Sequence, residues 1–323
     1  NKYVSSAAHL SGKRMVSCEE MTDTYTVFNT SLENLKIGSD QSIISGITHS
    51  VLHGFNYSPP DAPYPGWIRY GAWYNEKNNW WPHLYLFNEY KGRLSALLQN
   101  CDMYADIAML PPTADMWSLI GMQNEPFPSV LHADYLSLVW EAIVKNGGGC
   151  DYISERILGE AKIERGFIYY GTRKYHTLFL VQVESIDPDT ARKLLQFVRS
   201  GGWIFCIETF PSKSAGWLNH QNRDRETAVI VQKMKAYPDR FILLKKPEND
   251  FIGWYRTVQE RYRILPYLTI ENPDPFVMQT RYCADDGSEF IFIINSHLHD
   301  SHKTRVVFSA DVSRRKHCSV WDP

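Results

Sequence analysis

The stretch RMVSCEE, residues 14–20, places a short apolar run directly before two adjacent carboxylates. Residues 14–18 are expected to form a short buried strand, and a strand that finishes in Glu-Glu has two interpretations. One is a solvated loop after the strand. The other is a catalytic carboxylate at the mouth of a barrel, because α/β barrels keep their chemistry at the carboxyl ends of their strands.

The sequence around this stretch alternates between helical and strand patterns. Residues 31–46 are expected to form a helix that Ser31 caps, and residues 83–100 carry apolar side chains at helical spacing. Residues 48–53 are expected to form a second strand. Such alternation is typical of βα units with a parallel sheet, and two strands alone cannot make a stable sheet. If these are the last βα units of a (β/α)8 barrel, the six earlier units precede Asn1.

A second alternation predicts a doubly wound, flavodoxin-like α/β domain. Its expected strands are 106–110, 177–183, 203–207 and 241–244, and its expected helices are 133–145, 188–200 and 225–236. Residues 177–183 are almost continuously apolar, as expected for a strand that is covered on both faces.

The pattern changes to antiparallel β structure near the end of the sequence. The expected strands are 277–283, 290–295, 303–308 and 317–321, and Asp286-Gly287 is a hairpin turn signal. We therefore expect three domains. They are residues 1–102, the C-terminal part of a catalytic barrel; 103–265, a non-catalytic α/β domain; and 266–323, a β-strand segment leading into a truncated β domain.

Composition excludes several functional classes. The 323 residues are 44% hydrophobic and 22% charged, which is typical of a globular protein. Lys plus Arg number 34 and Asp plus Glu number 36, so a large electrostatic surface for nucleic acid is not expected. The sequence lacks an apolar run of the roughly 18 residues that a membrane span needs. The six cysteines are scattered singly without a CxxC pair, which argues against a zinc site or a disulfide framework.

Two features argue against catalysis or nucleotide binding in the second domain. The glycines at 147–149 follow an expected helix rather than opening one, so a phosphate-binding turn is not predicted there. Cys150 follows those glycines and Cys206 lies inside an expected strand. Neither cysteine occupies the sharp strand-to-helix turn that a nucleophile requires.

The connection at residues 54–82 is long and rich in aromatic side chains. Between Phe55 and Tyr90, 12 of 36 residues are aromatic, against 14% of the whole chain. Long connections of this kind are uncommon unless they are functional or pack as a cluster of their own. Flat rings suit the apolar face of a sugar, so the cluster predicts carbohydrate binding. For any single ring, packing in the core is the competing interpretation.

Three segments resemble the family 106 glycoside hydrolases, whose characterised members are α-L-rhamnosidases. They are GKRMVSCEEMT at 12–22, THSVLHGFNYSPPDAPYPGW at 48–67 and NNWWP at 78–82. The resemblance implies a bacterial enzyme of carbohydrate metabolism that is periplasmic or secreted. It implies hydrolysis of an α-L-rhamnoside by a two-carboxylate inverting mechanism, and a second domain that resembles the glutamine-amidotransferase fold. It also implies calcium, whose ligands cannot be assigned in this sequence; no metal ligand or cofactor site is predicted from the residues.

The resemblance places the catalytic residues at strand ends. Glu19 matches the family glutamate at the end of strand seven, and Glu20 is expected to point away as a solvated or paired surface neighbour. His53 ends strand eight and is expected to bind a sugar hydroxyl or to support Glu19. An ion pair with Lys or Arg for Glu19, and a core position for His53, are the alternatives. The remaining predicted substrate-binding residues are Tyr57, Trp67, Trp80 and Trp81.

The second catalytic carboxylate is not evident in this sequence. We expect it in the remaining part of the barrel, from the same or another chain, so this piece alone is expected to be inactive. The expected partner is an oligosaccharide or glycoside substrate, without nucleic acid and without a membrane span. A carbohydrate-binding or scaffold protein of the same fold, without activity, is the alternative.

Overall fold

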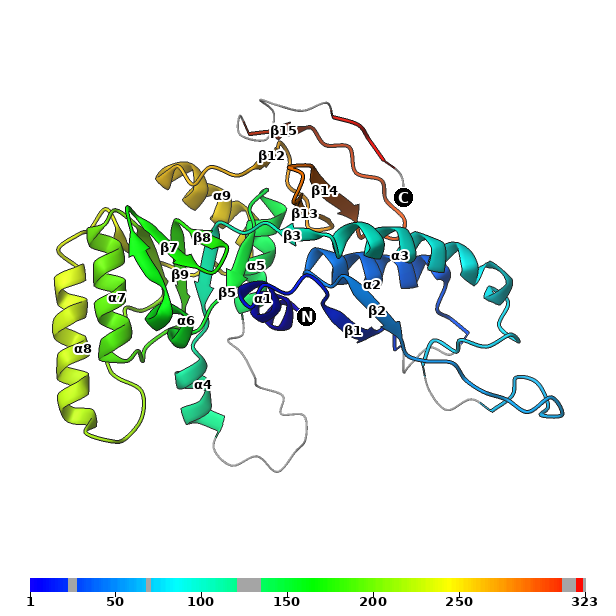
Figure 1. Ribbon diagram of the computed structural model, residues 1–323, viewed down its shortest axis with the longest axis horizontal. Coiled ribbons are helices and arrows are strands. Elements are labelled where there is room, and N and C mark those ends of the chain that lie inside the picture. Colours follow the sequence, from blue (N-terminus) through cyan, green and yellow to red (C-terminus); the bar gives the residue numbers. More distant parts are fainter. Residues whose placement is uncertain (23–27, 68–70, 121–134, 310–317, 322–323) are drawn as a thin grey trace. The chain divides into compact units, whose positions relative to one another are not determined.

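The computed structural model describes residues 1–22, 28–67, 71–120, 135–309 and 318–321 and contains two compact units. Unit 1 comprises residues 1–9, 13–103 and 270–323, and unit 2 comprises residues 10–12 and 104–269. The chain is a mixed α/β protein, and each unit contains a parallel sheet (Figure 1). The expected division into three domains stays a prediction.

Unit 1 combines a pair of parallel strands with helices and an antiparallel sheet. Its elements are α1 (Lys2–Leu10), which ends at the unit boundary, β1 (Ser17–Glu20), α2 (Leu32–Ile44), β2 (His49–Leu52), the 3-10 turn η1 (Trp81–His83), α3 (Leu84–Leu98), β3 (Cys101–Met103), β13 (Val277–Ala284), β14 (Glu289–Asn295) and β15 (Val306–Phe308). Strand β12 (Leu268–Ile270) crosses from unit 2 into unit 1. Strands β1 and β2 run parallel, whereas β14, β13 and β3 form an antiparallel sheet in that order.

Helices α2 and α3 form where the sequence predicts them. The Ser31 hydroxyl accepts a hydrogen bond from the Asn34 backbone N–H at 3.2 Å, and the Asn34 side chain accepts one from the Ser31 backbone N–H at 3.0 Å. This reciprocal cap satisfies two backbone donors that the first turn leaves unpaired, so the predicted cap at Ser31 is confirmed. The buried side of α3 repeats at three and four residues, from Leu84 and Phe87 to Leu94 and Leu98.

Strand β1 begins three residues later than the sequence pattern suggested. It runs from Ser17 to Glu20, so both glutamates belong to the strand. Arg14 lies before the strand and forms ion pairs with Asp102 of β3 and with Asp285 in the β13–β14 turn. These two carboxylates, Asp285 first, raise the pKa of Arg14. Arg14 therefore connects the approach to β1 with the antiparallel sheet of the same unit.

Unit 2 is built around five parallel strands. Its elements are β4 (Ile107–Leu110), α4 (Thr113–Ile120), α5 (Leu136–Lys145), β5 (Cys150–Tyr152), α6 (Glu155–Glu160), β6 (Lys162–Glu164), β7 (Phe167–Tyr170), β8 (Arg173–Tyr175), β9 (Thr177–Val181), α7 (Pro188–Arg199), β10 (Trp203–Ile207), α8 (His220–Met234), β11 (Phe241–Leu244) and α9 (Phe251–Tyr262). The strand order is β11-β10-β9-β4-β5, and β6, β7 and β8 form a small antiparallel sheet. Counted along the chain, the parallel strands lie in the order 2-1-3-4-5.

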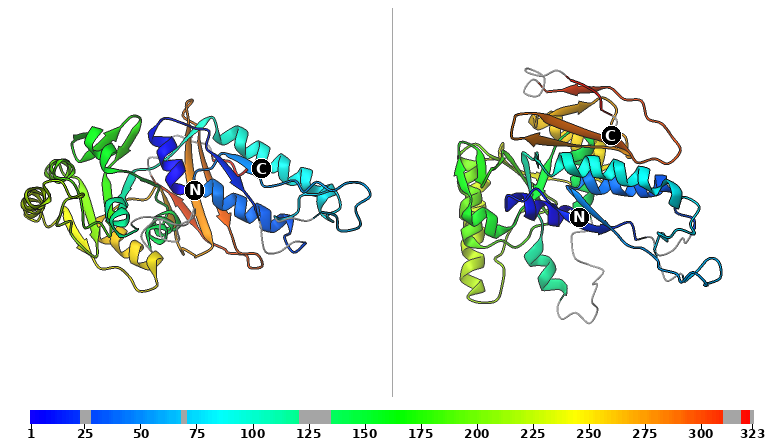
Figure 2. Two further views of the ribbon diagram at one scale, coloured as in Figure 1. Left: turned by 90° about the horizontal axis from the view of Figure 1, so that it is seen from below. Right: turned by 45° about the vertical axis from the view of Figure 1, so that its right-hand side comes forward.

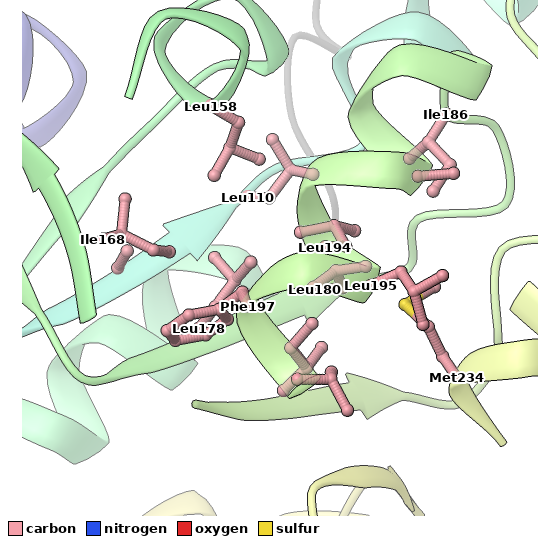
Figure 3. Packing of buried hydrophobic residues seen from close by; sticks show 14 of the residues in the cluster. Leu110, Leu158, Ile168, Leu178, Leu180, Ile186, Leu194, Leu195, Phe197 and Met234 are labelled. Carbon is pink, nitrogen blue, oxygen red and sulfur yellow. The ribbon is translucent and has the colours of Figure 1, made fainter. Parts of the chain in front are cut away.

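Both faces of the parallel sheet in unit 2 are covered. Leu178 and Leu180 of β9 pack with Leu194 and Phe197 of α7 in one apolar cluster (Figure 3). The residue between them, Phe179, faces the other way and approaches Tyr255 of α9, with ring centroids 6.1 Å apart. Because alternate side chains of a strand point to opposite faces, helices on both sides require an apolar strand throughout. The expected buried strand at this place is confirmed.

Several boundaries and short elements differ from the sequence-based expectation. The helix expected at 225–236 begins earlier, at His220. The prediction of a strand at 317–321 is wrong for residues 318–321, which form no strand. Residue 317 lies outside the described residues. The hairpin at Asp286-Gly287 is confirmed between β13 and β14. Strands of three residues, such as β3 and β5, are too short to show a periodic pattern.

Gly147, directly after α5, provides a test of backbone packing in unit 2. Its φ is +81°, and a Cβ atom there would lie 1.4 Å from the Leu268 carbonyl oxygen. We expect Gly147→Ala to lower the free energy of unfolding by about 3 kcal/mol, from left-handed strain and overpacking together. Gly159 in α6 meets no atom within 4 Å, so Gly159→Ala is the control. Denaturant unfolding measures both, and equal midpoints would contradict the expectation.

Candidate active site

The parallel pairing of β1 and β2 decides which side chains share a face. Ser17 pairs with His49, and Glu19 pairs with Val51. The Ser17 hydroxyl lies 2.8 Å from His49 Nδ1, so paired residues point to the same side. His53 follows Val51 by two residues and therefore belongs to this side as well. We call the side with Ser17, Glu19, His49, Val51 and His53 the open face.

Glu20 lies on the opposite face and is not a surface residue. Its side chain is 3% exposed, its Oε1 lies 3.4 Å from Lys91 Nζ of α3, and Ser39 of α2 donates a hydrogen bond to it at 3.2 Å. The expectation that Glu20 is a surface residue is therefore wrong. The alternative that Glu20 is paired is confirmed by its ion pair with Lys91. Neighbouring residues on a strand point to opposite faces, so the exposure of Glu19 turns Glu20 toward the helices. Burial lowers the pKa of Lys91, and the Glu20 carboxylate acts in the opposite direction.

A second group of polar side chains lies behind β1, between α2 and α3. Asp40 is buried and accepts a hydrogen bond from the Tyr90 hydroxyl at 2.7 Å. Lys36 pairs with the same carboxylate at 2.7 Å, and its ammonium lies 4.6 Å from the centre of the Tyr90 ring. Buried charges are stable in a protein only when they are paired. Asp40 thus links α2 to α3, and Glu20 links β1 to both helices through Lys91 and Ser39.

Glu19 and His53 bring a carboxylate and an imidazole close together on the open face. The Glu19 side chain is 68% exposed, and its Oε1 lies 3.6 Å from His53 Nδ1. The Thr22 hydroxyl lies 2.9 Å from the same nitrogen. Among the described residues, the basic side chain within 4 Å of the Glu19 carboxylate is His53 rather than a Lys or Arg, and His53 is half-buried rather than in the core. A carboxylate beside an imidazole can accept a proton from water or bind a hydroxyl group.

Buried amide side chains fasten the base of the aromatic connection. Asn75 donates a hydrogen bond to the Asn56 carbonyl, and Asn78 donates one to the Trp73 carbonyl at 3.1 Å. Trp73 is fully buried. Beyond this base, the connection that follows β2 extends as a loop past the ends of α2 and α3 (Figures 1 and 2). The amides of Asn75 and Asn78 thus bind backbone within the loop.

The four predicted substrate-binding rings fall into two classes. Tyr57 is 64% exposed and Trp67 is 63% exposed, and the Trp67 backbone N–H donates to the hydroxyl of Ser58 at 2.8 Å. Trp81 is half-buried, with its ring centroid 5.8 Å from that of Phe55.

Trp80, by contrast, belongs to the core of unit 1. It is 8% exposed, and its indole N–H donates to the Thr30 carbonyl at 2.9 Å. Its ring also packs edge-on against Tyr74 at 5.6 Å. Because only 8% of this side chain is exposed, the ring offers little surface to a ligand.

Sequence patterns missed three residues that shape this region: Thr22, Ser39 and Lys91. Lys91 stands on the apolar side of α3, which is the one signal that could have marked it, because a charged residue on a buried stripe needs a partner. Nothing in the spacing of Thr22 or Ser39 distinguishes them from ordinary surface hydroxyl residues.

Neither a metal site nor a membrane-spanning helix can be assigned. Among residues 1–22, 28–67, 71–120, 135–309 and 318–321, no three His, Cys, Asp or Glu side chains are grouped to hold a metal ion. In the same residues, no helix has the length and apolar character to cross a bilayer.

Comparison with known proteins identifies a family for this chain. The family model described as alpha-L-rhamnosidase, Glyco_hydro_106, matches residues 1–236, which is more than half of the sequence. A curated relative from Formosa agariphila, described as "Putative beta-glucuronidase", is 26% identical over 298 residues. That match covers 90% of this chain and 22% of the relative.

Solved structures show the same fold at low sequence identity. A rhamnosidase from Novosphingobium sp. PP1Y has a TM-score of 0.62 and 19% identity, over 90% of this chain and 26% of that one. Gan42B, a GH42 beta-galactosidase from G. stearothermophilus, has a TM-score of 0.56 and 11% identity, over 94% of this chain and 55% of that one. The chain thus spans about a quarter or less of the length of the rhamnosidase and of the curated relative.

Removal of the Glu20 charge tests the pairing behind β1. Glu20→Gln leaves the Lys91 ammonium buried without its counter-ion, so we expect a loss of about 3–5 kcal/mol in the free energy of unfolding. Adding Lys91→Met removes the uncompensated charge and should restore part of that loss. Thermal or denaturant unfolding measures the series, and a Glu20→Gln protein as stable as the wild type would show that the pair is dispensable.

Proposed function

The chain belongs to the family 106 glycoside hydrolases, and from this premise we propose that it supplies one catalytic carboxylate and part of the substrate platform of an α-L-rhamnosidase. The observation that carries this proposal is the exposed Glu19 carboxylate on the open face, 3.6 Å from His53. The name of the family model and the rhamnosidase fold support the choice of sugar.

The proposed reaction is hydrolysis with inversion at the anomeric carbon. One carboxylate takes a proton from water as the water attacks, and a second carboxylic acid protonates the leaving oxygen. The two carboxyl groups must lie roughly 6.5–9.5 Å apart to admit that water. We assign the base to Glu19, whose neighbour His53 can bind a sugar hydroxyl. Within the described residues Glu19 is the one carboxylate on the open face, so the acid is assigned to another part of the protein.

The open face supports the proposal that β1 and β2 are the last strands of a (β/α)8 barrel. Parallel strands are ordinarily covered on both faces, yet Val51 is 49% exposed here. In a barrel the remaining strands, from the same or another chain, enclose that face, and without them the piece is inactive. The strand order of unit 2 supports a flavodoxin-like domain, for which we propose a non-catalytic role. We further propose, from the family resemblance alone, that the whole protein is periplasmic or secreted.

Glu19→Gln in the full-length protein tests the catalytic assignment. The amide keeps the shape of the side chain but cannot accept a proton from water. We expect kcat to fall by about 10² to 10⁴ with little change in KM, because the lost interaction acts in the transition state. Hydrolysis of p-nitrophenyl α-L-rhamnoside and of p-nitrophenyl β-D-glucuronide, assayed in parallel, measures the effect and distinguishes the sugars that the two named relatives suggest.

Glu89→Gln is the matched control, since Glu89 is an exposed glutamate that pairs with Arg93 on α3. It should leave kcat unchanged. If the wild type binds these glycosides but cleaves neither, the carbohydrate-binding or scaffold alternative is favoured instead. Normal turnover by Glu19→Gln in an active protein would refute the assignment.

The two classes of tryptophan should respond differently to truncation. Trp67→Ala removes an exposed ring and should lower kcat/KM by an amount equivalent to about 1–3 kcal/mol, as for other aromatic stacking platforms, without a change in unfolding. Trp80→Ala removes a buried ring and should cost about 3–5 kcal/mol of stability. Steady-state kinetics and unfolding curves of both variants separate the classes; a Trp67→Ala protein that loses stability but keeps normal kinetics would assign that ring to the core.

A further inference from the structure

We propose that Thr22 is a positioning residue that holds His53 in the orientation in which its imidazole faces Glu19. The proposal rests on the proposed function and names a residue that the family comparison does not assign. The proposal is based on the arrangement of Glu19, Thr22 and His53 at the carboxyl ends of β1 and β2. The Thr22 hydroxyl and the Glu19 carboxylate both face the same ring nitrogen, His53 Nδ1.

The two distances assign different roles to the two oxygens. Thr22 Oγ1 lies 2.9 Å from Nδ1, which is a normal hydrogen-bond length. Glu19 Oε1 lies 3.6 Å from the same atom, which is too long for a good hydrogen bond. The hydroxyl therefore fixes the ring, and the fixed ring brings Nδ1 near the carboxylate without closing on it. Catalytic hydrogen bonds are often long before substrate binds and shorten in the reacting complex.

The strand geometry explains why Thr22 can reach the ring. β1 ends at Glu20, and β2, which pairs with it in parallel, ends at Leu52. Thr22 and His53 thus follow the same ends of two neighbouring strands. Both side chains are at least partly exposed, so the imidazole depends on specific contacts for its orientation.

Three substitutions at two positions test this role in the full-length protein. Thr22→Val keeps the shape but removes the hydroxyl, Thr22→Ser keeps the hydroxyl, and His53→Ala removes the ring. We expect Thr22→Val to lower kcat by about 10- to 100-fold with KM within about twofold, because small misplacements of a catalytic group have effects of this size. Thr22→Ser should stay within about threefold of the wild type. The substrate is whichever of the two p-nitrophenyl glycosides the wild type cleaves.

The double variant distinguishes positioning from a general structural role. If Thr22 acts through His53, Thr22→Val should change kcat by less than about twofold when His53 is already alanine, because the effects of coupled residues are not additive. Unfolding midpoints control for stability, and Thr22→Ala replaces Thr22→Val if the valine variant does not fold. Additive losses, an unchanged kcat in Thr22→Val, or a Thr22→Ser variant as impaired as Thr22→Val would each overturn the proposal. Loss of activity in Glu19→Gln with normal Thr22→Val would refute this inference alone, whereas normal Glu19→Gln activity would refute the catalytic assignment itself.

Discussion

The ion pair between Glu20 and Lys91 determines which way strand β1 faces. A glutamate that is 3% exposed needs a partner, and the partner belongs to the helix that packs behind the strand. Once Glu20 points to that helix, Glu19 must point away from it, because adjacent strand residues alternate. A slip of one residue would bury Glu19 and expose Glu20 instead. The open face, and with it the candidate site, depends on this choice.

The strand that carries Glu19 is thus held on its helix-covered side, and His53 lies near Glu19 on the open face. Glu20 links the strand to Lys91 of α3, and Asp40 of α2 is bonded to Tyr90 of α3. On the other side His53 lies 3.6 Å from Glu19. The buried groups that fix the backbone are therefore distinct from the exposed groups of the open face.

Local patterns allowed much of the fold to be predicted. The cap at Ser31, the amphipathic α3 and the apolar β9 each depend on residues close together in the sequence. The burial of Glu20 was missed because it depends on a partner far along the chain, Lys91. The start of β1 was missed because it depends on the pairing of Ser17 with His49 of β2.

The tryptophans of one loop show the same limit within a short segment. Trp67 and Trp80 lie in the same aromatic-rich connection, yet Trp67 is 63% exposed and Trp80 is 8% exposed. Only the tertiary contacts of each ring separate them.

At residues 147–149 the sequence argued against a phosphate site, and the structure shows what Gly147 does. Its missing side chain leaves room for the Leu268 carbonyl.

The loop at residues 54–82 is attached at its base and exposed beyond it. Asn75 and Asn78 hold the base through hydrogen bonds to backbone carbonyls, while Tyr57 and Trp67 are exposed. Substitution of either exposed ring leaves those anchoring hydrogen bonds in place, so the surface of the loop can change while its attachment to the scaffold stays the same.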